Sequence, residues 1–328
     1  MSNKEFTTPE ESQTDEIKTD EMMEKAPWRR FTEEEWKELV DGKNKILKMR
    51  RKLFTSVMDV PEVDWIVDGF VVRDGITLLF GDAGIGKTSL MLQLIGCLSE
   101  GKGFLGLSTQ QADALLIEQD EGKPLLRSHI EKMLPAHPSL RWLEVPTVSI
   151  IWDNNAQDFE AKGTLLAEVI HSSLARVVII DSLTSLGITD INHPSVSLLF
   201  DKIRELAGIF HCAFVLLHHP NKSGDAMGSN LIKAKVDCLI QMESAGEAVK
   251  LIPHKVRGES FQEMILHLDP KTLTFQQVPL RDDWIWQLHQ EGKKPKEIAD
   301  IICPVYPGTT SNNVSVILNR LKGKHSSN

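Results

Sequence analysis

The strongest constraint on this chain is a glycine-rich stretch between a predicted strand and a predicted helix. The stretch fits G-x-x-x-x-G-K-[ST], the phosphate-binding P-loop, and its residues are Gly81-Asp82-Ala83-Gly84-Ile85-Gly86-Lys87-Thr88. The apolar run 76–80 before it predicts a buried strand, and residues 89–95 after it predict a helix. This context favours a phosphate site over the alternative, a glycine-rich turn that matches by chance.

The chemistry of the stretch follows from its residue types. Glycines let backbone N–H groups close around phosphate oxygens, and the helix N-terminus adds a partial positive charge. Lys87 is expected to reach the β- and γ-phosphates of a nucleotide, and the Thr88 hydroxyl is expected to ligate Mg²⁺. The expected nucleotide-binding residues are Gly81, Asp82, Ala83, Gly84, Ile85, Gly86, Lys87, Thr88 and Ser89.

Composition and charge limit the class of protein. With 328 residues, 41% hydrophobic and 25% charged, the chain suits a soluble α/β domain with small appendages. It has no apolar run of membrane-spanning length and begins with an acidic, polar segment, so we expect a cytoplasmic protein with no membrane partner. The net charge of −9 disfavours a protein whose whole surface binds nucleic acid, although the basic cluster 48–52 permits a local basic surface. The scattered cysteines are expected to be buried, reduced thiols: Cys97, Cys212, Cys238 and Cys303.

The pattern along the chain predicts four parts. Residues 1–27 form an acidic disordered leader, 28–59 a helical segment, 60–280 the main domain and 281–328 a small helical domain. Strands and helices alternate in the main domain, and four segments resembling antiparallel strands follow between residues 236 and 275. The predicted fold class is α/β, a mainly parallel sheet flanked by helices with an antiparallel edge.

The run Val177–Asp181 is apolar and β-branched, and it ends in a carboxylate. This is the pattern of a central parallel strand, and ligands of open α/β sheets bind at the carboxyl ends of such strands. Asp181 is therefore expected to reach the Mg²⁺ held by Thr88, directly or through water. The alternative is an aspartate that caps the next turn.

The C-terminal part has three predicted short helices. The third begins near Ser311 and places apolar residues at Val314, Ile317, Leu318 and Leu321. This spacing favours a helix-turn-helix that presents Asn312, Asn313 and Arg320, residue types that can read base edges. The alternative is a compact oligomerisation or lid subdomain.

Several stretches together resemble the RecA-like P-loop ATPases, most closely the branch that contains RepA-type replicative helicases. The resemblance covers about residues 60–280 and is carried by residues 65–69, 181–183, 218–222, 228–229 and 236–237. It implies a RecA-like core with ATP and Mg²⁺ as cofactors and a homo-oligomeric ring, as in hexameric relatives. It also implies single-stranded or duplex DNA as a partner.

The resemblance also implies roles for individual residues. Asp120 stands where relatives carry the glutamate that activates water, which leaves Glu118 and Glu121 open as alternatives. His219 stands at the place of a γ-phosphate-sensing glutamine, with His218 as its alternative. Zinc binding by these histidines with His211 and Cys212 is the weaker interpretation, because strand residues separate the pairs.

Lys255 and Arg257 resemble the K-x-R pair that hexameric relatives insert into a neighbour's ATP site. Alternation on a strand points both side chains the same way, whereas the alternative is an exposed basic edge strand. Met227 departs from the family's frequent arginine before Gly-Ser, which weakens the helicase interpretation.

The combined expectation is Mg²⁺-dependent ATP hydrolysis coupled to DNA in a replicative helicase or translocating ATPase. The expected phosphate contacts on DNA are Lys222, Lys233 and Lys235. Two alternatives stay open: an ATP-controlled DNA-binding regulator, and a protein-remodelling or signalling ATPase without a nucleic-acid role.

Overall fold

The computed structural model describes residues 63–118, 123–134, 140–144, 159–183, 195–219, 230–246, 248–306 and 308–325. The chain divides into two compact units, 1–53 and 54–328, and every described residue belongs to the second. The predicted leader 1–27 and helical segment 28–59 therefore lie outside the described residues.

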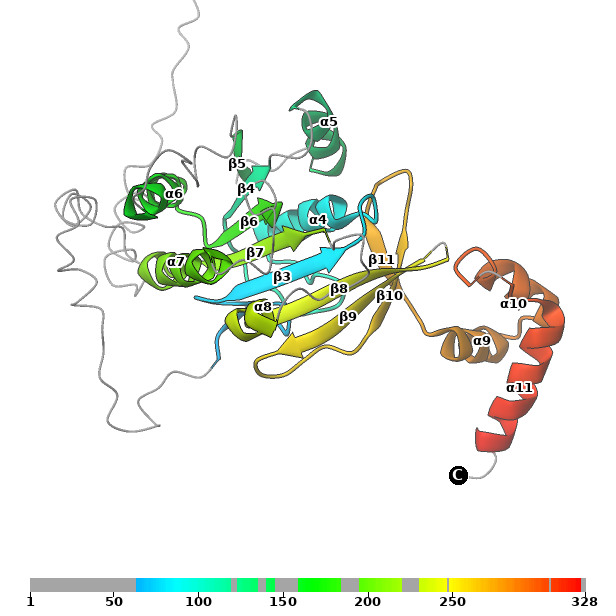
Figure 1. The fold of residues 1–328 in the computed structure, drawn as a ribbon. Helices are drawn as coiled ribbons and strands as arrows, with labels where there is room; N and C mark the ends of the chain where they lie inside the picture. The colour runs from blue at the N-terminus through cyan, green and yellow to red at the C-terminus, as the bar shows by residue number, and fades with distance from the viewer. Residues whose placement is uncertain are drawn as a thin grey trace, which may run out of the picture. The chain divides into compact units, whose positions relative to one another are not determined.

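A nine-stranded sheet forms the centre of the fold (Figure 1). From edge to edge its strands are β11 (Phe275–Val278), β10 (Met264–Leu268), β9 (Ala248–Val256), β8 (Cys238–Ala245), β3 (Ile76–Gly81), β7 (Ala213–His218), β6 (Val177–Asp181), β4 (Ala114–Glu118) and β5 (Leu140–Glu144). Strands β8 to β5 in this order pair in parallel, and β9, β10 and β11 extend the sheet antiparallel. The predicted α/β fold with an antiparallel edge is confirmed.

One detail of the predicted edge is wrong. The sequence pattern predicts an antiparallel strand at residues 236–242, but β8 pairs in parallel with β3, and only its other side is antiparallel, to β9. Strand β8 thus joins the two halves of the sheet. The short strands β1 (Trp65–Val67) and β2 (Val71–Val72) form a separate antiparallel pair.

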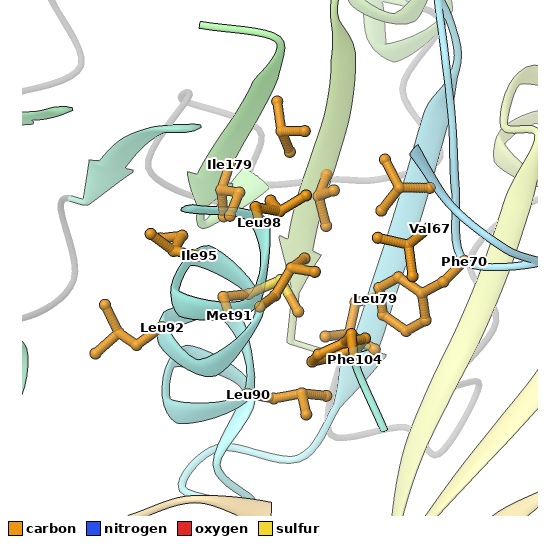
Figure 2. Packing of buried hydrophobic residues seen from close by; sticks show 14 of the residues in the cluster. Val67, Phe70, Leu79, Leu90, Met91, Leu92, Ile95, Leu98, Phe104 and Ile179 are labelled. Atoms are coloured by element: carbon orange, nitrogen blue, oxygen red, sulfur yellow. The ribbon is translucent and has the colours of Figure 1, made fainter. Parts of the chain in front are cut away.

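The central strands are mostly apolar because both faces of the sheet are covered. Every residue of β3, β6 and β7 is buried. Alternate residues such as Leu79 and Ile179 pack with helix α4 (Lys87–Glu100), and Figure 2 shows the α4 side chains Met91 and Ile95 among them. The intervening residues are buried as well, and α7 (Ser195–Phe210) contacts β3 and β7. Two-sided burial explains the continuous apolar runs in the sequence.

The remaining helices complete the described domain. They are α5 (Lys123–Met133), α6 (Phe159–Ser173) and the short α8 (Asn230–Lys235), which immediately precedes β8. None of the helices in the described ranges is long and apolar enough to cross a membrane.

The parallel strands give the sheet two distinct ends. We call the end where β3, β7, β6 and β4 finish the carboxyl edge, and the opposite end, where they begin, the amino edge. Strand β9 runs antiparallel to β8, and Cys238 pairs with Val256, so β9 finishes at the amino edge. Residues following β3 and residues following β9 therefore lie at opposite ends of the sheet.

Three helices follow the sheet, as predicted: α9 (Arg281–Gln290), α10 (Pro295–Ile302) and α11 (Ser311–His325). They share a small core that includes Ile285, Ile298 and Val314. The heptad-like spacing on the third helix is thus explained by packing against the other two. Their assignment as a helix-turn-helix stays a prediction.

The cysteine prediction is correct in part. All four thiols are free, Cys212 and Cys238 are buried, and burial raises the pKa of Cys238 to about 12. Cys97 is only partly buried, and Cys303 is exposed because it lies at the C-terminal cap of α10, beyond the helix core. The expectation of a buried thiol is therefore wrong for Cys303.

Candidate nucleotide site

The glycine loop between β3 and α4 has the backbone shape that its sequence predicts. Gly84 and Gly86 adopt φ values of +77° and +98°, which residues with a side chain rarely adopt. Gly86 caps α4 without a side-chain hydrogen bond, so the cap leaves the first helical N–H groups to an anion. A Cβ at Gly86 would also lie 2.7 Å from the Phe275 ring, so both backbone and space require glycine here.

Lys87 is the first residue of α4 and is buried. Its ammonium donates to the carbonyl oxygens of Gly81 and Asp82, over 2.8 and 3.0 Å, and lies 3.1 Å from Nδ1 of His219. An ammonium only donates, so Nδ1 of His219 accepts. The predicted P-loop lysine and the predicted γ-phosphate sensor are thus in direct contact.

Thr88 and Asp181 meet, although 93 positions separate them in the sequence. The Thr88 hydroxyl donates to Oδ2 of Asp181 over 2.6 Å, and Asp181 is buried. A hydroxyl and a carboxylate are hard oxygen ligands of the kind that Mg²⁺ prefers, usually together with waters and phosphate oxygens. These two side chains therefore fit the predicted magnesium site.

The predicted carboxylates after the second core strand are described only in part. Glu118 ends β4, is buried, and pairs in register with Asp181 on β6. Asp120 and Glu121 lie outside the described residues. Activation of water by one of these three carboxylates stays a prediction, and among the described residues Glu118 lies beside Asp181.

The two histidines at the end of β7 occupy different surroundings. His218 is the last strand residue and is buried, whereas the partly exposed His219 contacts Lys87. Loss of hydration lowers the pKa of His218 to about 4, and the positive charge of Lys87 adds to this effect. His218 is therefore neutral at physiological pH. Among the described residues, no group of three or more His, Cys, Asp or Glu could hold a metal ion such as zinc.

The low pKa of His218 predicts a specific loss of stability in acid. The unfolded chain binds a proton below the ordinary pKa of 6.5, and the folded chain does so only near 4. The contribution of neutral His218 to the free energy of unfolding is fully present above pH 6.5 and is lost as pH falls. The loss reaches about 3 kcal/mol near pH 4.

We expect His218→Gln to remove that part of the pH dependence. The measurement is the free energy of unfolding in urea from pH 7 to pH 4, with His289→Gln as the control. The control should lose as much stability in acid as the parent protein. Equal acid sensitivity in all three proteins would contradict the assignment.

Lys255 and Arg257 lie at the amino edge, and the P-loop of the same chain lies at the carboxyl edge. The two ends of β3 alone are separated by roughly 17 Å. Lys255 donates to the carbonyl oxygens of Lys233 and Val236, and Arg257 donates to that of Ala234 over 3.1 Å. The two cations thus meet at the C-terminal end of α8, where the helix dipole favours positive charge.

The predicted DNA contacts that the structure describes lie on two helices, α8 and α11. Lys233 and Lys235 are on α8, where Lys235 forms an ion pair with Asp201, and Lys222 lies outside the described residues, as does Met227. At the start of α11, Asn312 is exposed, and the Asn313 side chain donates through Nδ2 to the Gly308 carbonyl. Arg320 pairs with Asp282 of α9.

A contact between the glycine loop and the antiparallel edge of the sheet is not predicted by any sequence pattern. The Gln93 side chain of α4 forms two hydrogen bonds with the backbone of Phe275, of 2.8 and 2.7 Å. Phe275 in turn packs beside Gly86. Gln93 and Phe275 are 182 positions apart in the sequence, so the contact between β11 and the glycine loop is seen only in the folded structure.

The sheet order and the residues at its carboxyl edge define a P-loop ATPase with a RecA-like α/β core. A family model described as an AAA domain matches residues 54–225, just over half of the chain. The chain therefore belongs to this AAA domain family, whose P-loop architecture implies nucleotide binding. A search of curated proteins finds no significant match.

Proposed function

We propose that this protein is a Mg²⁺-dependent ATPase whose hydrolysis sites are each shared by two copies in a ring, and that hydrolysis is coupled to DNA. The observation that carries the proposal is the position of Lys255 and Arg257 at the amino edge, the end of the sheet opposite the P-loop. In the proposed head-to-tail ring, the amino edge of one copy would face the carboxyl edge of the next, since such rings join two different surfaces of the subunit.

Within one copy, the P-loop backbone and Lys87 would bind the β- and γ-phosphates, and Thr88 and Asp181 would hold the metal ion. Bound Mg²⁺ neutralises charge that develops on the phosphates. A carboxylate among Glu118, Asp120 and Glu121 orients the attacking water. His219, which contacts Lys87, is placed to respond to the γ-phosphate.

The next copy contributes the remaining positive charge. Lys255 and Arg257 both bond the end of α8, which agrees with side chains that act together. Cations that stabilise the transition state of phosphoryl transfer raise the rate by about 10³- to 10⁵-fold in known cases. A copy that lacks a neighbour would hydrolyse ATP slowly.

Coupling to DNA is the finer part of the proposal. It is supported by the resemblance to replicative helicases, by the helical unit that exposes Asn312, and by the lysines of α8. A protein-remodelling ATPase is the second candidate. The net charge of −9 favours it, as do the ion pairs in which Lys235 and Arg320 already take part.

The test is the ATPase rate without DNA, with single-stranded DNA and with duplex DNA, each at 50 and 200 mM salt. Stimulation by DNA that weakens at the higher salt concentration is expected, because phosphate contacts release counterions. Lys233→Gln should reduce the salt dependence of binding by about one ion, and Lys202→Gln on α7 should not.

The two alternatives give different results in the same experiment. Salt-dependent duplex binding without a change in rate would favour the DNA-binding regulator. Neither binding nor stimulation would contradict the coupling to DNA and favour the protein-remodelling ATPase.

A further inference from the structure

A buried carboxylate at the amino edge connects Arg257 to the body of the sheet. Asp237, the residue before β8, is 6% exposed. Its Oδ1 lies 3.2 Å from Nη1 of Arg257, and its Oδ2 accepts from Nη2 of Arg204 over 2.8 Å. One carboxylate thus binds two guanidinium groups, one from helix α7 and one from the end of β9.

The backbone fixes Asp237 in place. Its Oδ2 also accepts from the Ile76 amide over 2.8 Å, and its own amide donates to the Ile76 carbonyl over the same distance. The Arg257 amide donates to the Asp237 carbonyl over 3.1 Å. Asp237 is therefore held by the first residue of β3, the strand that ends in the P-loop, and in turn holds Arg257.

The charges of this group leave Arg257 able to act on an anion. Two guanidinium groups share one carboxylate, so the three side chains carry a net charge of +1, and Lys255 adds another. The Arg257 side chain is 55% exposed, although its terminal nitrogens contact Asp237 and Ala234. An arginine held on one side and exposed on the other is a preorganised electrostatic group.

We propose that Asp237 and Arg204 are positioning residues for Arg257, which they hold ready for the phosphates bound by a neighbouring copy. This inference rests on the proposed sharing of sites between copies. Arg204 has a distinct part, because by occupying Oδ2 it prevents Asp237 from neutralising Arg257 fully. Arg204 also donates to the Lys235 carbonyl over 2.6 Å, which ties α7 to the end of α8.

The primary test is Asp237→Asn, which keeps the shape of the side chain and removes its charge. We expect kcat for ATP to fall by roughly 10- to 100-fold, part of the known contribution of such arginines, with KM unchanged. Asp201→Asn is the matched control, because Asp201 lies beside the same end of α8, pairs with Lys235 and does not contact Arg257 in the structure. Its kcat should equal that of the parent protein.

A mixing experiment separates positioning from a general structural role. The Asp237→Asn chain keeps an intact P-loop, and the Lys87→Ala chain keeps an intact Arg257. Mixing them should restore hydrolysis at interfaces where the second chain supplies Arg257. Unchanged kcat in Asp237→Asn, or a loss that mixing does not restore, would overturn the proposal.

Two further variants, Arg257→Ala and Arg204→Leu, separate a failure of the shared site from a failure of the role of Asp237. Arg257→Ala mixed with Lys87→Ala tests the sharing of sites itself, so if that mixture stays inactive the proposed function fails and not the role of Asp237 alone. Arg204→Leu replaces Asp237→Asn if the latter does not fold. Its kcat should also fall and be restored by mixing, and full activity in Arg204→Leu would overturn the proposal.

Discussion

Lys87→Ala is expected to reduce the rate of ATP hydrolysis by about 10³-fold or more, because it removes the cation that lies among the phosphate-binding groups. In the structure the Lys87 ammonium bonds two carbonyl oxygens of its own loop and contacts His219. Alanine cannot replace any of these contacts, and it leaves the phosphates without their closest positive charge.

The measurement is phosphate release at saturating ATP, together with the midpoint of thermal unfolding. Lys87 is buried, so the unfolding midpoint is needed to show that the loop variant still folds. Lys102→Ala is the control, because Lys102 lies just beyond α4, pairs with Glu100 and is largely exposed. A folded Lys87→Ala protein with near-normal activity would contradict the assignment of the P-loop as the hydrolysis site.

Arg257→Ala is expected to give the second large effect, a fall in kcat of about 10³-fold with ATP affinity unchanged. The structure explains why kcat should fall while the affinity for ATP stays the same. In the proposed ring, ATP would bind at the carboxyl edge of one copy, whereas Arg257 lies at the amino edge and would act only on phosphates bound by a neighbour.

Titration with a fluorescent ATP analogue measures the affinity, and steady-state hydrolysis measures kcat. Lys250→Ala on the same strand is the control, since Lys250 pairs with Glu263 and does not lie at the end of β9. A parallel loss of affinity and kcat would place Arg257 in the binding site of its own chain and contradict the shared site.

The sequence predicted the parts of the site that depend on local order. The P-loop and its flanking strand and helix are contiguous, so the pattern of residues 76–95 was sufficient. Asp181 was predicted because an apolar run that ends in a carboxylate has one common position in a parallel sheet. Its 2.6 Å hydrogen bond with Thr88 agrees with that interpretation.

The sequence did not predict contacts that depend on how distant strands pair. Asp237 bonds Ile76, which is 161 positions away, and it meets Arg204 only because β8 lies beside β3 and α7 packs nearby. The motif at residues 236–237 marks Asp237 as part of the family resemblance but does not indicate its contacts with Ile76 and the two arginines. The grouping of β8 with the antiparallel strands failed for the same reason, since both faces and both neighbours of a strand decide its pairing.

The measurement that tests the shared site most directly is ATP hydrolysis by a mixture of Lys87→Ala and Arg257→Ala chains. Each chain alone should be almost inactive. In an equal, random mixture, about a quarter of the interfaces combine an intact P-loop with an intact Arg257. We expect activity to return toward about a quarter of the parent value. A mixture no more active than its separate components would contradict sites completed by a neighbouring copy.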